Sequence, residues 1–353
     1  GLGDVYKRQV YMNRFLGLSD SQRKSVYESI ADKVGLPAQV IEKDFWVTAI
    51  LQTIFSLPIA EHLVFKGGTS LSKGWKLIER FSEDIDVAVN PAFLGAPEGD
   101  LTKKQIKKLR KASSLFVLEE LTPMICEELK RQGLLSFVTV NAQPNGEGNT
   151  TYPEPRQIYL HYKSVFDKKI TYLRPDIVLE VSARSLLEPT ESIQIKSIIG
   201  EHLPITPLVD SAVYTAIPAK TFLEKAFLLH ELFSVPGHGM IAERKSRHLY
   251  DLYVMMNKDF AKKAIADDAL WESIRHHREI YTSVKDVDYT PDVRKRLRIV
   301  PRKDILEEWK SDYQAMMESM IYGKKPSFEE LLDALSELQE RFRTVSYTHL
   351  TLP

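Results

Sequence analysis

The sequence has one cysteine among 353 residues, Cys126, and a formal net charge of +0 at pH 7. A single cysteine excludes both a disulfide scaffold and a cysteine-based zinc site within the chain. The balance of charges argues against a protein that coats nucleic acid over its whole surface, although it leaves room for a local basic patch.

Long hydrophobic runs, internal repeats and low-complexity tracts are also missing. No interior apolar run reaches the roughly 20 residues that a membrane-spanning helix needs. The length and the 43% hydrophobic content are those of a globular protein with room for two domains. We therefore expect a cytoplasmic protein with no membrane partner.

The two ends of the sequence resemble translated sequencing-adapter DNA. Residues 4–9 read Asp-Val-Tyr-Lys-Arg-Gln, and residues 345–353 read Val-Ser-Tyr-Thr-His-Leu-Thr-Leu-Pro. We expect residues 1–9 and 345–353 to be tails that take no part in the fold.

The remaining chain divides into a mixed first part and a helical second part. Hydrophobic spacing, caps and breakers predict helices at 38–55, 71–80 and 102–132, the last kinked or broken at Pro123. A further helix begins near residue 19. Strands are expected at 63–65, 81–89, 136–140, 157–162 and 175–181, and all strands should lie between 63 and 199. From Thr221 onward the pattern is helical, so the domains are expected at 10–203 and 204–344.

A glycine turn is the first half of the most informative segment. Residues 65–71 read Phe-Lys-Gly-Gly-Thr-Ser-Leu, which predicts a strand, a turn and the start of a helix. Gly67 and Gly68 permit positive φ and a close approach of a ligand to the backbone. Thr69 and Ser70 then lie at a helix start, where free N–H groups attract anions. The turn therefore predicts a phosphate site.

Two acids on the following strand are the second half. Residues 81–89 read Phe-Ser-Glu-Asp-Ile-Asp-Val-Ala-Val, so Asp84 and Asp86 project from one face and Ile85 from the other. Like charges this close are held together when a cation lies between them, and Mg²⁺ suits carboxylates, phosphate and water. The alternative is a strand with an acidic rim beside a capped helix, but the ordered combination favours a phosphate and metal site.

A third carboxylate would complete a two-metal site. Glu180 is the candidate, because on its strand it shares a face with Asp176 and Val178. The alternative is that Glu180 marks a solvated strand end.

With these motifs the chain resembles the AbiEii/AbiGii toxin family, nucleotidyltransferases of the polymerase-β-type superfamily. The resemblance rests on the glycine turn, the acidic strand and three further segments, and it spans about 41–253. Those segments are Glu-Lys-Asp-Phe-Trp-Val at 42–47, Ala-Lys-Thr-Phe-Leu-Glu-Lys-Ala at 219–226 and Arg-His-Leu-Tyr-Asp-Leu-Tyr at 247–253.

The resemblance implies an α+β fold: a nucleotidyltransferase core with a mixed β-sheet flanked by helices, followed by a mainly helical C-terminal domain. It implies a toxin of a toxin–antitoxin or phage-defence system that transfers a nucleoside monophosphate from a nucleoside triphosphate to an acceptor. RNA such as a tRNA 3′ end is the expected acceptor, and a cognate antitoxin is an expected partner.

The implied site draws on both domains. Asp84, Asp86 and Glu180 would be catalytic and would bind Mg²⁺ or Mn²⁺, and Lys225 and Asp251 would be catalytic as well. The implied nucleotide-binding residues are Lys66, Gly67, Gly68, Thr69, Ser70, Ser82 and Arg247. From spacing alone, Lys225 could instead snorkel past the core, and Arg247 could form a structural ion pair with Asp251.

Two other functions stay open. One is a nucleotide-binding regulatory module without transfer activity, and the other is a protein phosphotransferase. Against the phosphotransferase, residues 68–73 lack the Walker spacing Gly-x-x-x-x-Gly-Lys-[Ser/Thr].

Two basic clusters could guide RNA phosphates, although such runs are often merely solvated faces. The first consists of Lys103, Lys104, Lys107, Lys108 and Lys111. The second consists of Arg294, Lys295, Arg296, Arg298, Arg302 and Lys303.

Overall fold

The computed structural model describes residues 12, 14–82, 84–147, 151–167, 174, 176–203 and 213–345. The chain forms two compact units. The sheet unit comprises residues 1–76 and 81–216, and the helical unit comprises residues 77–80 and 217–353. The expected boundary next to residue 204 lies outside the described residues, as do the expected tails apart from Val345, so these limits stay predictions.

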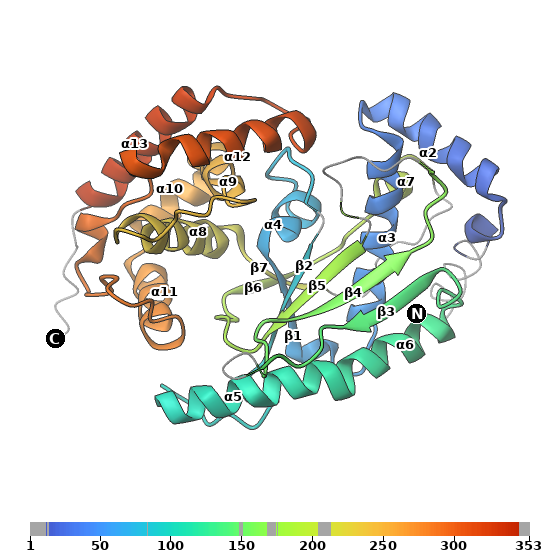
Figure 1. The fold of residues 1–353 in the computed structure, drawn as a ribbon, viewed down its shortest axis with the longest axis horizontal. Coiled ribbons are helices and arrows are strands. Elements are labelled where there is room, and N and C mark those ends of the chain that lie inside the picture. Colours follow the sequence, from blue (N-terminus) through green and yellow to red (C-terminus); the bar gives the residue numbers. More distant parts are fainter. Residues whose placement is uncertain are drawn as a thin grey trace. The chain divides into compact units, whose positions relative to one another are not determined.

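The described part of the sheet unit contains a mixed seven-stranded sheet in the order β3-β4-β5-β2-β1-β7-β6 (Figure 1). The pairs β2/β5 and β1/β7 are parallel and the others are antiparallel. The strands are β1 (Leu63–Lys66), β2 (Ile85–Val89), β3 (Val138–Ala142), β4 (Arg156–Tyr162), β5 (Asp176–Ser182), β6 (Thr190–Ile193) and β7 (Val213–Ala216).

Helix α3 (Ala38–Phe55) forms much of the core of this unit. Pro37 precedes it, and almost all of its side chains are buried. Trp46 stacks on Tyr162 of β4 with 5.7 Å between ring centroids, so α3 packs against the sheet. The other helices of the unit are α2 (Asp20–Val34), α4 (Gly67–Thr69), α5 (Lys103–Phe116), α6 (Thr122–Arg131) and α7 (Ile198–His202).

The helical unit packs around aromatic side chains. Trp271 lies 4.4 Å from Phe227 and 5.6 Å from Phe342 between ring centroids, which joins three of its helices. The helices are α8 (Pro218–Phe233), α9 (Arg247–Met255), α10 (Asp259–Ala266), α11 (Asp268–Tyr281), α12 (Leu306–Ser319) and α13 (Phe328–Thr344). None of the helices in the described part of the chain combines the length and the apolar character of a membrane span.

The architecture confirms the predicted α+β class, with a mixed sheet followed by a mainly helical region. The helix predicted at 38–55 has the observed bounds. The helix predicted at 102–132 consists of α5, a π-helical turn η3 (Val117–Leu121) and α6. Pro123 lies in the first turn of α6, where its missing N–H costs no hydrogen bond, so the interruption precedes it.

Three expectations were wrong. The helix predicted at 71–80 ends after the π-turn η2 (Ser70–Gly74), because Lys76 takes a positive φ of 52° and residues 77–80 belong to the helical unit. The strand predicted at 81–89 begins only at Ile85, so Asp84 precedes it. The limit of strands to 63–199 also fails, because β7 lies beyond residue 199 and pairs with β1.

Candidate active site

A row of polar residues crosses four neighbouring strands of the sheet. Asp86 pairs with Lys66 on one side and with Glu180 on the other, and Glu180 pairs with Gln157. We call these four residues the polar row. Residues in register share one face of a sheet, with Cβ atoms about 5 Å apart. All four are partly exposed, whereas Ile85 and Val87, on the opposite face, are buried.

The glycine turn closes directly onto the polar row. Gly67 has a φ of +78°, and a Cβ atom on it would lie 2.0 Å from Oδ2 of Asp86. Only glycine combines this backbone conformation with so close an approach. The missing side chain therefore lets the turn and the Asp86 carboxylate meet.

The hydroxyl groups around the turn are used inside the protein. Thr69 is buried and donates to the Asp84 carbonyl oxygen, and its Oγ1 also lies 3.0 Å from Oγ of Ser82. Ser70 is buried, and its Oγ donates to the Gly67 carbonyl oxygen at 2.8 Å. These bonds fix the turn's shape. The predicted nucleotide-binding roles of Gly68, Thr69, Ser70 and Ser82 stay predictions.

Asp84 lies just outside the row. Its side chain is 14% exposed, and its Oδ1 lies 3.9 Å from Nη1 of Arg174. Because Asp84 precedes β2, strand alternation does not set the direction of its side chain, in contrast to Asp86.

Glu180 is oriented by a chain of hydrogen bonds that the sequence did not reveal. Nε2 of Gln157 donates to Oε1 of Glu180 at 2.6 Å, and the Tyr159 hydroxyl donates to Oε1 of Gln157 at 2.6 Å. The predicted metal-binding role of Glu180 stays a prediction.

The polar row fits a divalent cation that takes its other ligands from water and substrate. Among the residues that the structure describes, no three His, Cys, Asp or Glu side chains form a ready-made metal cluster. Mg²⁺ is, however, usually held by one or two carboxylates together with waters and substrate phosphates. Asp86 and Glu180 are such a pair, and within the described chain the Asp86 carboxylate accepts no hydrogen bond or ion pair.

Three consecutive polar residues of α3 are buried and bind other segments of the sheet unit. Glu42 accepts from Ser164 Oγ at 2.6 Å, and Lys43 donates to the Asp176 carbonyl oxygen at 3.0 Å. Asp44 forms a buried ion pair with Lys73, directly after the glycine turn. The segment at 42–44 therefore ties α3 to three other segments, which accounts for these residue types in a core helix.

The helical unit contains a buried ionic cluster around Asp251. Arg80 binds it bidentately, with Nε 2.7 Å from Oδ1 and Nη2 2.9 Å from Oδ2, and Nζ of Lys225 lies 2.8 Å from Oδ2. Burial alone would raise the pKa of Asp251, but the charges and hydrogen bonds of Arg80 and Lys225 hold it well below its usual range. Arg80 was missed, because nothing in one sequence marks a partner 171 residues away.

His248 extends this cluster. Its Nδ1 lies 3.2 Å from Nζ of Lys225, so the ring accepts from the ammonium group. Burial, followed by the charges of Lys225 and Arg247, lowers the pKa of His248 well below its ordinary value. The cluster lies wholly in the helical unit. The catalytic roles predicted for Lys225 and Asp251, and the nucleotide-binding role predicted for Arg247, stay predictions.

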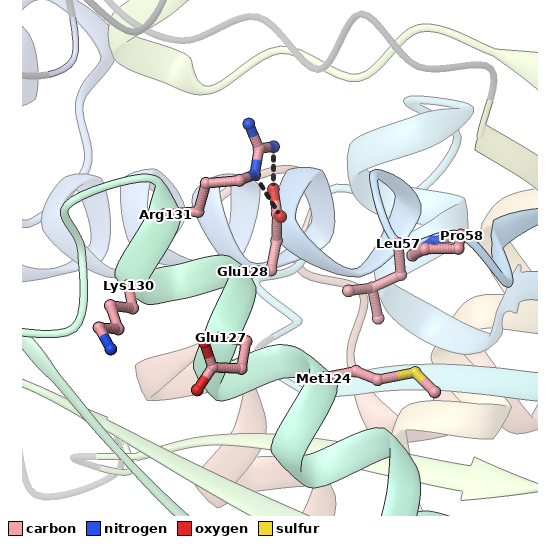
Figure 2. Close-up of a pocket in the computed structure, with 7 residues that line it drawn as sticks. All are labelled: Leu57, Pro58, Met124, Glu127, Glu128, Lys130 and Arg131. Carbon is pink, nitrogen blue, oxygen red and sulfur yellow. Dashed lines mark hydrogen bonds and ion pairs between the residues drawn. The ribbon is translucent and has the colours of Figure 1, made fainter.

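A surface pocket of about 630 Å³ lies away from the polar row, where α6 meets the residues after α3 (Figure 2). Within it, Glu128 accepts from Arg131 and from Ser56. Burial would raise the pKa of Glu128, but hydrogen bonds from Arg131, Gln132 and Ser56 lower it overall. This carboxylate therefore links α6 to Ser56 at the end of α3. The lining residues are Leu57, Pro58, Met124, Glu127, Glu128, Lys130 and Arg131.

The fold and the site have the features of a nucleotidyltransferase: a mixed sheet, a glycine turn and adjacent carboxylates. The family model described as the nucleotidyl transferase AbiEii toxin of type IV toxin–antitoxin systems matches residues 49–334. The chain belongs to this family, which confirms the resemblance seen in the sequence. The matched stretch includes the polar row, the glycine turn and the Asp251 cluster.

Two solved structures are similar at low sequence identity. JHP933 from Helicobacter pylori has 14% identity and a TM-score of 0.42, with 87% of this chain and 93% of that chain covered. A proposed nucleotidyltransferase from H. pylori has 13% identity and a TM-score of 0.44, with 87% and 96% covered. A comparison with curated proteins found no match.

Replacing Gly67 by alanine should destabilise the protein more than the same change at Gly95. Both glycines have φ near +78°, so each substitution costs about 1–2 kcal/mol of backbone strain. At Gly67 the new Cβ also collides with Asp86, which should add about 1–3 kcal/mol, whereas Gly95 has no neighbour within 4 Å. Urea unfolding of both variants measures the difference, and equal losses would contradict the close approach.

Unfolding free energy should fall as the pH drops from 7 to 5, in part because of His248. Its pKa is lowered in the folded chain, so the unfolded chain binds the proton first, near its ordinary pKa of about 6.5. His248 thus stabilises the fold above that pH, and this contribution is lost by up to about 1.4 kcal/mol per pH unit below it.

Substituting His248→Gln keeps an acceptor for Lys225 but removes the titration, so the pH slope should become shallower. Urea titrations at several pH values measure it. The half-exposed His276 provides the control variant His276→Gln. An unchanged slope in His248→Gln would show that His248 does not stay neutral in the fold.

Proposed function

We propose that this chain is a Mg²⁺-dependent nucleotidyltransferase that moves a nucleoside monophosphate from a nucleoside triphosphate to a hydroxyl group of RNA. The polar row carries this proposal, because Asp86 and Glu180 are adjacent on neighbouring strands and the glycine turn meets Asp86. Membership of a family of toxins from type IV toxin–antitoxin systems supports the toxin role. A cognate antitoxin is the partner we propose, and defence against phage is a setting that suits such a toxin.

Asp86 and Glu180 would hold the ion through their carboxylates, and Asp84 is the predicted third ligand. When bound, Mg²⁺ would neutralise charge on the triphosphate during an in-line displacement. Lys66, next to Asp86 in the row, would contribute a positive charge to the binding of the phosphates. The backbone N–H groups that follow Gly67 would receive the outgoing phosphates.

The proposed step forms a bond between the acceptor oxygen and the α-phosphorus and breaks the bond to the β-phosphate, which leaves as pyrophosphate. The hydroxyl proton passes to a carboxylate of the row. Glu180 is the candidate for this proton, since the hydrogen bond from Gln157 fixes its position. A tRNA 3′ end supplies a hydroxyl group of the required kind.

A regulatory module that binds nucleotide without transfer is less well supported. Such a module would have no need for a second acid next to the metal-binding one. Glu180 pairs directly with Asp86, so this arrangement favours turnover.

Nucleotide transfer can be tested with nucleoside triphosphates that carry ³²P at either the α or the γ position. With Mg²⁺ and total tRNA, the α label should enter RNA and the γ label should not. The variant Asp86→Asn should lower labelling by about 100-fold or more, because it removes a charge at the reacting phosphates.

Asp333→Asn provides the control, since Asp333 is an exposed aspartate of α13. It should label RNA like the native chain. Equal labelling by Asp86→Asn would refute the role of the polar row, and transfer of the γ label would identify a phosphotransferase instead.

A further inference from the structure

Helix α5 presents a regular array of lysines to solvent. Its five lysines are exposed, whereas Leu109, Ser113 and Phe116 on the other side are buried. We call the array the α5 lysine face. Its members are Lys103, Lys104, Lys107, Lys108 and Lys111.

These lysines form few interactions within the described part of the chain. Within the described part of the chain, Lys103, Lys104, Lys107 and Lys108 make no hydrogen bond or ion pair through their side chains. Lys111 lies over the ring of Tyr152, 5.0 Å from its centroid. The face therefore carries a local positive charge on a chain with no net charge.

The second basic cluster of the sequence behaves differently. Arg294 pairs with Asp268, and Arg296 pairs with Asp292 at 2.9 Å. Arg302 donates to backbone carbonyl groups, including that of Val235 at 2.9 Å. Three of the four arginines of that cluster thus have structural partners, which distinguishes it from the α5 lysine face.

The position of the lysines opposes the stability of the helix. Lys103 and Lys104 occupy its first turn, where the helix dipole favours acids. The pairs four residues apart, such as Lys103 with Lys107, repel each other by a few tenths of a kcal/mol. Residues that weaken their own helix without a structural gain point to a role in binding.

The helix is nevertheless held firmly. Its start has a capping box between Thr102 and Gln105, and Ser114 accepts from Nε of Arg156 at 3.0 Å. Its end packs through Phe116 against Phe93, with 5.6 Å between ring centroids. Figure 1 shows α5 continuing into α6 as one long rod, so the array is presented on a fixed support.

We propose that the α5 lysine face binds the phosphodiester backbone of RNA. Lysines four residues apart recur about every 6 Å along a helix axis, which suits a closely spaced row of phosphates. Lysine binds phosphate as a point charge, and such contacts need no particular base.

The composition of the face argues against other partners. A membrane-bound helix inserts apolar side chains, but those of α5 are buried in the protein. The centre of a protein–protein interface is typically rich in aromatic and apolar side chains, and the α5 lysine face has none. A nucleic-acid backbone needs only the charges.

The face belongs to the same compact unit as the polar row. That the bound RNA is the acceptor of the transfer rests on the proposed function. The binding itself does not, because it involves neither nucleotide nor Mg²⁺.

Fluorescence anisotropy of a labelled RNA hairpin with the full chain tests the proposal, with salt varied from about 50 to 200 mM. The variant Lys103→Gln/Lys104→Gln/Lys107→Gln/Lys108→Gln should bind about tenfold or more weakly at the lowest salt. The magnitude of the slope of log affinity against log salt should fall by about 3–4, since each of the four lysines on a phosphate contributes about 0.7–0.9.

The control variant removes the same charge elsewhere. It carries Lys258→Gln, Lys262→Gln, Lys263→Gln and Lys285→Gln, four exposed lysines of the helical unit. It should keep the native affinity and slope, and circular dichroism should show both variants folded.

Equal RNA binding by the two variants would overturn the proposal, as would binding of the native chain to phosphatidylserine vesicles but not to RNA. A chain that binds RNA through α5 but labels none would contradict the proposed function and leave this inference intact.

Discussion

The contact between a glycine backbone and a carboxylate is the constraint on which the site depends. Gly67 has no Cβ and takes a left-handed conformation, so the turn can close onto Asp86. The strand register then fixes the rest: β1 brings Lys66 to one side of Asp86, and β5 brings Glu180 to the other. A single steric requirement therefore joins the glycine turn to the pair of acids.

The buried charges of each unit are paired or hydrogen-bonded within that unit. In the sheet unit, Asp44 holds Lys73 behind the glycine turn. In the helical unit, Asp251 is held between Arg80 and Lys225. A buried charge without a partner costs several kcal/mol, so the loss of one member of either cluster would leave the other badly solvated. Such clusters also make the surrounding packing more rigid.

Local patterns in the sequence predicted the parts of the structure that local chemistry controls. Pro37 and the helical spacing after it defined α3, and strand alternation identified Asp86 and Glu180. Contacts between distant segments could not be predicted from a single sequence. Arg80 was expected in a helix, yet it binds Asp251, and Gln157 orients Glu180 from a strand whose neighbour could not be known. Strand β7 is only four residues long and pairs with both β6 and β1, contacts that its short sequence does not indicate.

The central claim is that Asp86 and Glu180 share one divalent cation, and a double-mutant cycle on Mn²⁺ affinity tests it most directly. Affinity would be measured by electron paramagnetic resonance for Asp86→Asn, Glu180→Gln and the double variant. If both carboxylates hold the same ion, the second substitution should cost much less once the first has been made, because the site is already lost. Strictly additive losses, or native affinity in either single variant, would contradict a shared ion.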